Sequence, residues 1–414
     1  MKVKRFTISL ITASILPSLS IAQELFSIQD LSFIGATRFL DVVAGESRLG
    51  YANGTFTIDS KKESIFIVGH EQHQAIAEYK LNGFSKGATL QDLPLAEPIL
   101  QEYVRVLDKA TGGNPENLDK ITGLELISGK LIVNAAQFYD ADAGNRDTTL
   151  VITDPSDIKN SEIQGFSELD GGVHAAGWMT QIPQPLRDQF KADYIFGYAS
   201  NLPINSRNSM GPSAFLVNSN HVVSAISGEM INTTPVLDYS IDYPLHEDHY
   251  NKTGENNLWT EISKAYIGFI VPGTKTYAVF GFSAGHNSGI GYKITQDTGF
   301  QCGGACSKVA SDRYNYYWLW NVDDLIEVKN GNKMPYDLMP YEYGRIVLPF
   351  EGSDSQNGPH TLIGAHYSYD EQKLFLMLGF ADNSQGQYEP LPVLLAYDLH
   401  PGKRPAAPKD LVVE

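Results

Sequence analysis

The sequence predicts an all-β fold, a single β-propeller with five four-stranded blades. One pattern recurs five times along the 414 residues: a glycine begins an apolar strand, a short polar turn follows, and a second apolar strand runs back. A supersecondary unit repeated in this way is typical of propellers, in which each repeat forms one blade. We call the glycines that begin these hairpins the blade glycines: Gly54, Gly123, Gly177, Gly268 and Gly364.

Two more strands follow each hairpin and complete a blade. The expected strands are 54–59, 64–70, 75–81 and 99–106 in the first blade, then 123–127, 130–134, 149–152 and 164–169 in the second. They are 177–180, 194–197, 213–217 and 235–239 in the third, and 268–271, 276–281, 316–322 and 343–350 in the fourth. The fifth unit has 364–367, 373–377 and 393–399 but lacks an outer strand.

The apolar strand at 31–40 belongs to none of these units. Adding it to the fifth unit makes five complete blades and closes the ring, which protects the edges of the sheets. Six or seven blades stay open as alternatives, with further blades in 82–120, 218–262 and 283–312. A sandwich of several sheets is the other alternative, and we prefer the five-bladed ring.

The two ends of the chain differ from the repeats. Basic residues precede an apolar run, and a small-residue cleavage pattern ends at Ala22, so residues 1–22 are predicted to be a signal peptide. An N-terminal membrane anchor is the alternative reading of this run, and we expect no other span. Residues 23–400 would form the propeller and 401–414 a Pro-rich tail, with the mature protein periplasmic or extracellular.

The net charge limits the classes of binding partner, and the two cysteines suggest a disulfide. A formal charge of −17 argues against nucleic acid and against unaided binding to anionic membranes. A saccharide or another small molecule remains the expected partner, and the sequence does not specify the oligomeric state. The two cysteines, Cys302 and Cys306, are expected to form a small disulfide loop, with a metal site as the alternative.

Alternating strand direction predicts which loops share one end of the ring. The loops that enter each inner strand and the loops that follow each second strand emerge together, on what we call the first face. Seven of the ten histidines map to this face: His70, His73, His174, His246, His249, His286 and His360. Imidazole is a general acid or base near neutral pH and a metal ligand. We therefore take His70, His174 and His286, with Tyr198, as candidate catalytic residues.

Carboxylates map to the same face and suggest a metal or a glycosidase site. Glu71, Asp140, Glu261 and Asp382 are the candidate metal ligands, and Ca²⁺ or Zn²⁺ is the metal that they or the histidines would suit. A pair of carboxylates could also serve glycoside hydrolysis. Solvation of the surface is the alternative for each residue. The His70/His73 and His246/His249 pairs lack the helical spacing of a zinc protease motif.

Aromatic and basic residues complete the candidate site. Tyr139 and Trp259 could stack on sugar rings, while Lys120 and Arg207 could bind an acidic group. Tyr together with His is also the pair that a β-eliminating lyase uses, one group taking the proton next to a carboxylate and one protonating the leaving oxygen. Ordinary packing within the blades is the alternative for the aromatic residues.

Four segments resemble a group of secreted bacterial β-propeller proteins that has no established activity. The segments are 33–40, 67–70, 281–286 and 318–326, and the resemblance covers most of the mature length. It implies the fold and export but no reaction. More loosely, the chain is similar in fold to the five-bladed propellers of arabinanase-like glycosidases and of the sugar-binding tachylectin. Neither group's motifs can be matched residue by residue here.

These observations lead to three hypotheses for function. The first is a secreted carbohydrate-active enzyme that degrades a polysaccharide, by β-elimination if the substrate is a uronate. The second is a metal-dependent hydrolase of a small ester or lactone. The third is a non-catalytic propeller that binds a glycan or a protein.

Overall fold

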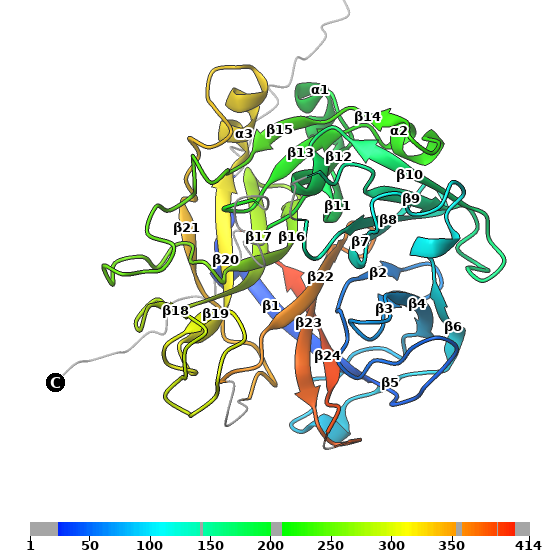
Figure 1. Cartoon of the computed structure of the whole chain (residues 1–414), viewed down its shortest axis with the longest axis horizontal. Coiled ribbons are helices and arrows are strands. Elements are labelled where there is room, and N and C mark those ends of the chain that lie inside the picture. The colour runs from blue at the N-terminus through cyan, green and yellow to red at the C-terminus, as the bar shows by residue number, and fades with distance from the viewer. Residues whose placement is uncertain (1–23, 141–143, 200–208, 353–357, 387, 402–414) are drawn as a thin grey trace, which may run out of the picture.

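Five sheets surround one axis in the computed structural model of the chain (Figure 1), which describes residues 24–140, 144–199, 209–352, 358–386 and 388–401. Each sheet places one strand next to the axis. These inner strands are β2 (Phe56–Asp59), β7 (Lys120–Ile127), β11 (Trp178–Gln181), β16 (Lys264–Ile270) and β22 (Leu362–Ser368). Each inner strand contacts the next around the ring, and β2 contacts β22, so the ring is closed. The predicted all-β propeller with five blades is confirmed.

The strand order within the blades follows the chain. Blade 1 continues from β2 with β3 (Ser64–Val68), β4 (Ala75–Lys80) and β6 (Ile99–Arg105), and blade 2 from β7 with β8 (Lys130–Ala136), β9 (Thr149–Ile152) and β10 (Ile163–Leu169). Blade 3 adds β12 (Tyr194–Gly197), β13 (Ala214–Val217) and β15 (Thr234–Leu237) to β11. Blade 4 adds β17 (Thr276–Ala284), β20 (Arg313–Asn321) and β21 (Glu342–Arg345) to β16.

Blade 5 contains both ends of the propeller. After β22 come β23 (Lys373–Asp382) and β24 (Leu391–Leu399), and the outer strand is β1 (Leu31–Phe39). Strand β1 runs antiparallel to β24, from the Leu31–Leu399 pair to the Arg38–Val393 pair. The N-terminal strand therefore closes the ring as the sequence predicted. Two short strands extend sheets in parallel: β5 (Leu95–Ala96) beside β1 and β14 (Met230–Ile231) beside β10.

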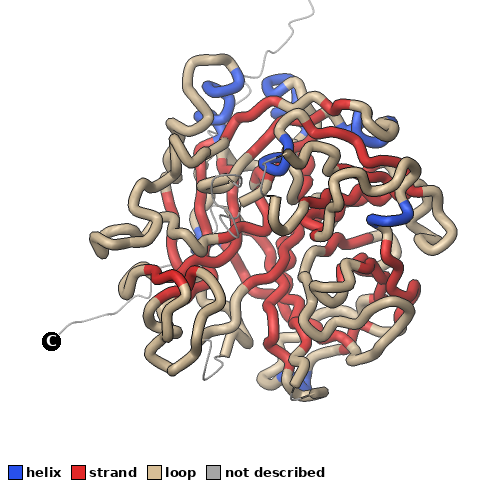
Figure 2. Tube along the Cα trace, viewed as in Figure 1, coloured by secondary structure: helices blue, strands red, loops and turns tan. Residues whose placement is uncertain are grey.

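The insertions form helices and one small hairpin, and the described parts of 82–120, 218–262 and 283–312 make no further blade. The helices are α1 (Gln184–Phe190), α2 (Ser219–Ser224) and α3 (Val322–Lys329), with short 3-10 turns at Ile28–Asp30, Leu90–Asp92, Leu107–Lys109 and Gly172–Ala175. Strands β18 (Ile290–Tyr292) and β19 (Ala305–Ser307) pair within the long insertion of blade 4. Figure 2 shows the three α-helices at the periphery of a body made of strands.

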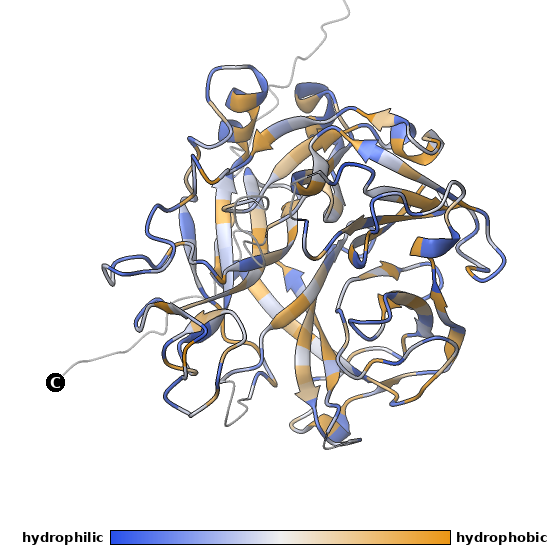
Figure 3. Cartoon of the chain, in the orientation of Figure 1, coloured by the Kyte–Doolittle hydropathy of each residue, from blue (hydrophilic) through white to orange (hydrophobic). Residues whose placement is uncertain are grey.

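Apolar side chains fill the spaces between the blades. Every residue of β3, β9 and β13 is buried, and Trp259, Trp318 and Trp320 are fully buried around blade 4. Figure 3 shows apolar residues along the strands and polar residues along the outer loops. Removal of this apolar surface from water is the main stabilisation of the ring.

Two blade glycines lie where neighbouring inner strands meet most closely. A Cβ atom on Gly364 would lie 1.7 Å from the carbonyl oxygen of Gly54, and one on Gly123 would lie 1.8 Å from that of Gly177. In both cases the added Cβ would meet a backbone atom, so no side-chain movement could relieve the clash. The recurrent glycine is therefore required by the packing of the ring.

Replacing Gly364 with alanine tests this requirement. We expect Gly364→Ala to lower the free energy of unfolding by at least about 3 kcal/mol, because two inner strands would have to separate. Urea denaturation measures the change. Gly303→Ala is the matched control, since a Cβ at Gly303 meets nothing within 4 Å. Equal stability of the two variants would contradict the packing argument.

Candidate functional site

A funnel on the first face opens onto the propeller axis, with a volume of about 240 Å³. All five blades contribute residues from the starts of inner strands and from the segments after second strands. The charged residues of the lining are Glu71, Lys120 and Lys264; the aromatic ones are Phe138, Trp178, Tyr198, Tyr266 and Phe380; and Asn53, Thr55, Thr122 and Gln137 add polar groups. We call this site the axial funnel.

Two lysines and one carboxylate set the charge of the funnel. Lys120 Nζ donates a hydrogen bond to Glu71 Oε1 at 2.7 Å and lies 5.2 Å from the ring centre of Phe138. Lys264 Nζ lies 4.9 Å from the ring centre of Tyr266. Among the described lining residues, two ammonium groups thus face one carboxylate, which leaves a net positive charge in a chain of formal charge −17. The funnel is suited to an acidic ligand.

The lysines also determine the ionisation of Glu71. Burial alone would raise the pKa of its carboxyl, but the hydrogen bond from Lys120 and the charges of Lys120, Lys264 and His70 outweigh burial and lower the pKa below its usual value. Burial raises the pKa of Tyr266. Near neutral pH the lining of the funnel therefore contains both an ionised carboxylate and a protonated phenol.

Tyr198 is held by the Ser213 side chain of blade 3. Its N–H donates to Ser213 Oγ at 2.7 Å, and the same hydroxyl donates to the carbonyl of His174 at 2.6 Å. Trp178, at the start of β11, donates its indole N–H to the Tyr277 hydroxyl at 3.2 Å. These contacts from blades 3 and 4 hold the two aromatic residues of the funnel lining in place.

Three sequence-predicted site residues meet in this funnel: Glu71, Lys120 and Tyr198. The candidate histidines do not, and no histidine is among the described residues that line it. His70 stacks on His73 with ring centres 4.6 Å apart, and its Nδ1 accepts from the Gln72 N–H at 3.1 Å. His174 Nδ1 lies 2.8 Å from Asp238 Oδ1.

His286 is partly buried beside blade 4. Its Nε2 is 2.7 Å from Ser283 Oγ, and its ring packs against Tyr314 and Tyr316. Burial lowers the pKa of His286 to about 4, so this imidazole is neutral near neutral pH. The three histidines are thus held by separate local contacts instead of converging on the axis.

The candidate metal ligands also lie apart. Asp140 accepts from the N–H groups of Gly144 and Asn145 within its own loop. Asp382 is fully buried, lies 3.5 Å from Arg38 and accepts from Ser384. Glu261 is buried, and its N–H donates to the His249 carbonyl at 2.7 Å. Among the described residues, no cluster of three or more His, Cys, Asp or Glu side chains could hold a metal ion.

The other candidates have different surroundings. Trp259 is fully buried and packs against Trp318 with ring centres 5.0 Å apart, whereas Tyr139 is exposed. Arg207, the predicted signal peptide 1–22 and all but the first residue of the predicted tail 401–414 lie outside the described residues. Cys302 and Cys306 form the predicted disulfide.

Lys264, Tyr266, Phe138 and Phe380 line the funnel but were not predicted from the sequence. A signal for one of them was available: Lys264 precedes its blade glycine by four residues and Lys120 precedes its own by three. Applied to charged residues as well as to histidines, the rule that sorts loops by face would have included both lysines among the candidates.

Comparison with known proteins adds a loose similarity of fold. No protein-family model and no curated protein matches the chain. A similar solved structure is a β-1,3-galactosidase of glycoside hydrolase family 43 with galactodeoxynojirimycin, at 8% sequence identity and a TM-score of 0.32, covering 86% of this chain and 94% of that one. The propeller assignment rests on the sheet topology described above. In the described parts of the chain, helices long and apolar enough to cross a membrane are absent.

The coupling of Glu71 to Lys120 gives a prediction for pH titration. In Lys120→Met we expect the pKa of Glu71 to rise, because the hydrogen bond and the nearer positive charge are lost while burial stays. In the native protein, the stability that this ionised carboxylate contributes is present above its unfolded pKa and is lost as the pH falls through its lowered folded pKa. Carbon NMR of labelled glutamates measures the shift.

Lys109→Met is the control for this titration. Lys109 pairs with Glu46 at 3.9 Å, outside the funnel lining, so its removal should leave the Glu71 titration in place. A Glu71 titration that is the same in Lys120→Met and in native protein would rule out the coupling.

Proposed function

We propose that this protein is an exported carbohydrate-active enzyme whose axial funnel binds an acidic saccharide and cleaves it by β-elimination. The observation that carries the proposal is the pair Lys120 and Lys264 among aromatic side chains in the funnel of an otherwise acidic protein. Export is supported by the leader-like N-terminal sequence and by the disulfide, since disulfides persist in oxidising compartments.

Recognition follows from the lining. A uronate carboxylate or a sulfate would interact with the two ammonium groups, and the sugar ring would stack on an aromatic face. Because Lys120 already pairs with Glu71 at 2.7 Å, an acidic ligand would share this lysine with the carboxylate. A neutral saccharide would bring no negative charge to pair with Lys264.

The reaction that suits this set of groups is elimination at a uronate. Lysines that neutralise the uronate carboxylate make the C5 proton more acidic. A base takes this proton, its electron pair forms the C4–C5 double bond, the C4–O bond breaks and the leaving oxygen is protonated. Glu71, ionised near neutral pH, can accept the proton, and Tyr266, protonated there, can donate to the leaving oxygen. Tyr198 then faces the saccharide from blade 3.

Hydrolysis has weaker support. Glycosidases of the usual type need two carboxyl groups flanking the bond, and Glu71 is the one carboxylate among the described lining residues. For a metal-dependent hydrolase, the described residues contain no group of three or more His, Cys, Asp or Glu side chains that could hold the metal ion. A binding propeller without catalysis would use the same funnel, and product formation separates it from the lyase.

A panel of polysaccharides tests the proposal. The protein is incubated with alginate, polygalacturonate, a glycosaminoglycan and neutral xylan, and the ultraviolet absorbance of the unsaturated product is followed. We expect product from an acidic polymer, a fall in kcat/KM of about 10- to 100-fold in Lys120→Ala and in Lys264→Ala from the lost charged contacts, and a loss of about 100-fold or more in kcat in Tyr266→Phe.

Lys109→Ala, outside the funnel, is the matched control and should keep native activity. Binding of an acidic polymer without any unsaturated product would replace the lyase with the binding propeller. Cleavage of xylan in preference to the acidic polymers would overturn the proposed substrate class.

A further inference from the structure

The opposite face of the propeller carries a second hollow, of about 550 Å³. Inner-strand ends and turns of blades 1, 2, 3 and 5 line it, and none of its described lining residues lines the axial funnel. We call it the opposite hollow. Asp59, Asp154 and Asp370 with Lys61 and Lys62 stand at its turns, and Glu125 and His366 come from the strands β7 and β22.

Glu125 and His366 form a buried pair in this hollow. Glu125 Oε2 lies 3.5 Å from His366 Nδ1, and the two side chains are 13% and 6% exposed. Each residue stands two places after its blade glycine. In the other three blades the same position holds Phe56, Met179 or Ile270. The propeller therefore does not require a polar group at this position.

Burial acts on both groups of the pair. Burial raises the pKa of the Glu125 carboxyl well above its usual range and lowers the pKa of His366 to about 3. Removing water disfavours both charged forms, and the His366 imidazole is neutral near neutral pH, with one ring nitrogen that donates and one that accepts. A buried polar group without adequate hydrogen bonds is destabilising. The pair is therefore less stabilising than the apolar residues that stand at the same position in the other three blades. Polar groups with such a cost are expected where they serve binding.

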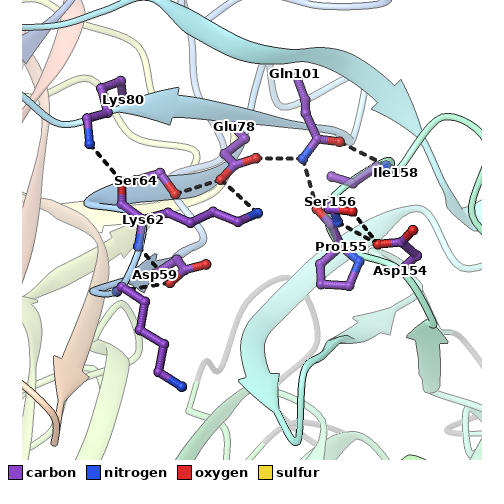
Figure 4. Close-up of polar contacts among 11 residues, drawn as sticks. Asp59, Lys62, Ser64, Glu78, Lys80, Gln101, Asp154, Pro155, Ser156 and Ile158 are labelled. Carbon is purple, nitrogen blue, oxygen red and sulfur yellow. Dashed lines mark hydrogen bonds and ion pairs between the residues drawn. The ribbon is translucent and has the colours of Figure 1, made fainter.

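A hydrogen-bond network fixes one wall of the opposite hollow (Figure 4). Buried Glu78 of β4 accepts from Ser64 Oγ at 2.6 Å and from Gln101 Nε2 at 2.6 Å. Gln101 also donates to the carbonyl of Pro155 at 2.8 Å and accepts from the Ile158 N–H at 2.8 Å. The network binds the 154–158 turn of blade 2 to blade 1, so this wall is in place before any ligand arrives.

The lining indicates the class of ligand. Asp59, Asp154 and Asp370 against Lys61 and Lys62 leave an excess of one negative charge at the turns, which disfavours anions. Thr180, Ser368 and Gln181 add groups that both donate and accept hydrogen bonds, and Tyr194 and Tyr369 add aromatic surface. Hydroxyl groups around a ring whose faces carry C–H bonds match this combination, as in a neutral sugar.

We propose that the opposite hollow is a second binding site, which takes a neutral saccharide with the Glu125–His366 pair hydrogen-bonded to its hydroxyl groups. The site is separate from the acidic-saccharide site of the axial funnel and does not depend on it. One protein would then hold two saccharides of different charge at the two ends of its axis.

An array of neutral and uronate oligosaccharides tests the proposal, followed by calorimetry of the full chain with the best neutral oligosaccharide. We expect Glu125→Leu to weaken this binding by about tenfold, because an apolar side chain of similar size replaces the carboxyl group that would bond to the sugar hydroxyl groups. Ser156→Trp, at the exposed turn, should also weaken it by narrowing the mouth. The Lys120→Ala/Lys264→Ala double variant should bind the neutral oligosaccharide as the native protein does.

Thermal unfolding of each variant separates binding from stability, and Ser156→Trp changes an exposed residue away from the buried pair. Neutral binding that survives both Glu125→Leu and Ser156→Trp would overturn the proposal, as would binding that is lost in the double lysine variant. A native protein that binds uronate oligosaccharides but no neutral ones would also overturn it, while leaving the function proposed for the funnel intact.

Discussion

Close approach of the five inner strands is the constraint on which the rest of the structure depends. At Gly364 and Gly123 the neighbouring backbone lies so near that a Cβ would sit within 1.8 Å of a carbonyl oxygen. Only glycine allows this approach, because it has no side chain. Once the strands are this close, residues at their two ends are brought toward one axis. Both the axial funnel and the opposite hollow follow from that geometry.

Closure of the ring depends on a pairing between distant parts of the chain. Strand β1 joins β24 across more than 350 residues, from Leu31 opposite Leu399 onward. The two paired strands are far apart in the sequence, and neither sheet edge is protected until both strands have been made and have met. The N-terminal strand therefore does for blade 5 what the fourth strand of each other blade does locally. Stability of the whole ring is coupled to this one ladder.

The fold was predictable from the sequence because its signals are local. Apolar alternation, a polar turn and a leading glycine mark each hairpin. The strand near Phe33 belongs to no hairpin, and the fifth blade is the one blade that lacks an outer strand in the sequence pattern. The site was less predictable. His70 and Glu71 are adjacent in the chain, yet Glu71 lines the funnel and His70 stacks on His73 beside it. Adjacent residues in a loop can point their side chains in unrelated directions, because loops lack the regular alternation that determines side-chain direction in strands.

Register irregularities explain why even the strand residues were hard to place. The β7–β8 ladder shifts between Ile121 and Gly123, and the β16–β17 ladder shifts between Ala265 and Ile267. Such a bulge changes which face the following side chains occupy, because side chains alternate with a period of two. Lys120 and Lys264 stand just before these shifts. Counting alternation back from the blade glycines would therefore misplace them, although their position at the strand entrance was readable.

The two ends of one inner strand explain how one ring can carry two unlike sites. Lys120 begins β7 in the axial funnel, and Glu125, five residues later, reaches the opposite hollow. At about 3.3 Å per residue the strand separates them by roughly 16 Å. The positive charge of Lys120 and the Glu125–His366 pair therefore lie at opposite ends of the strand, and each end can be specialised for a ligand of different charge.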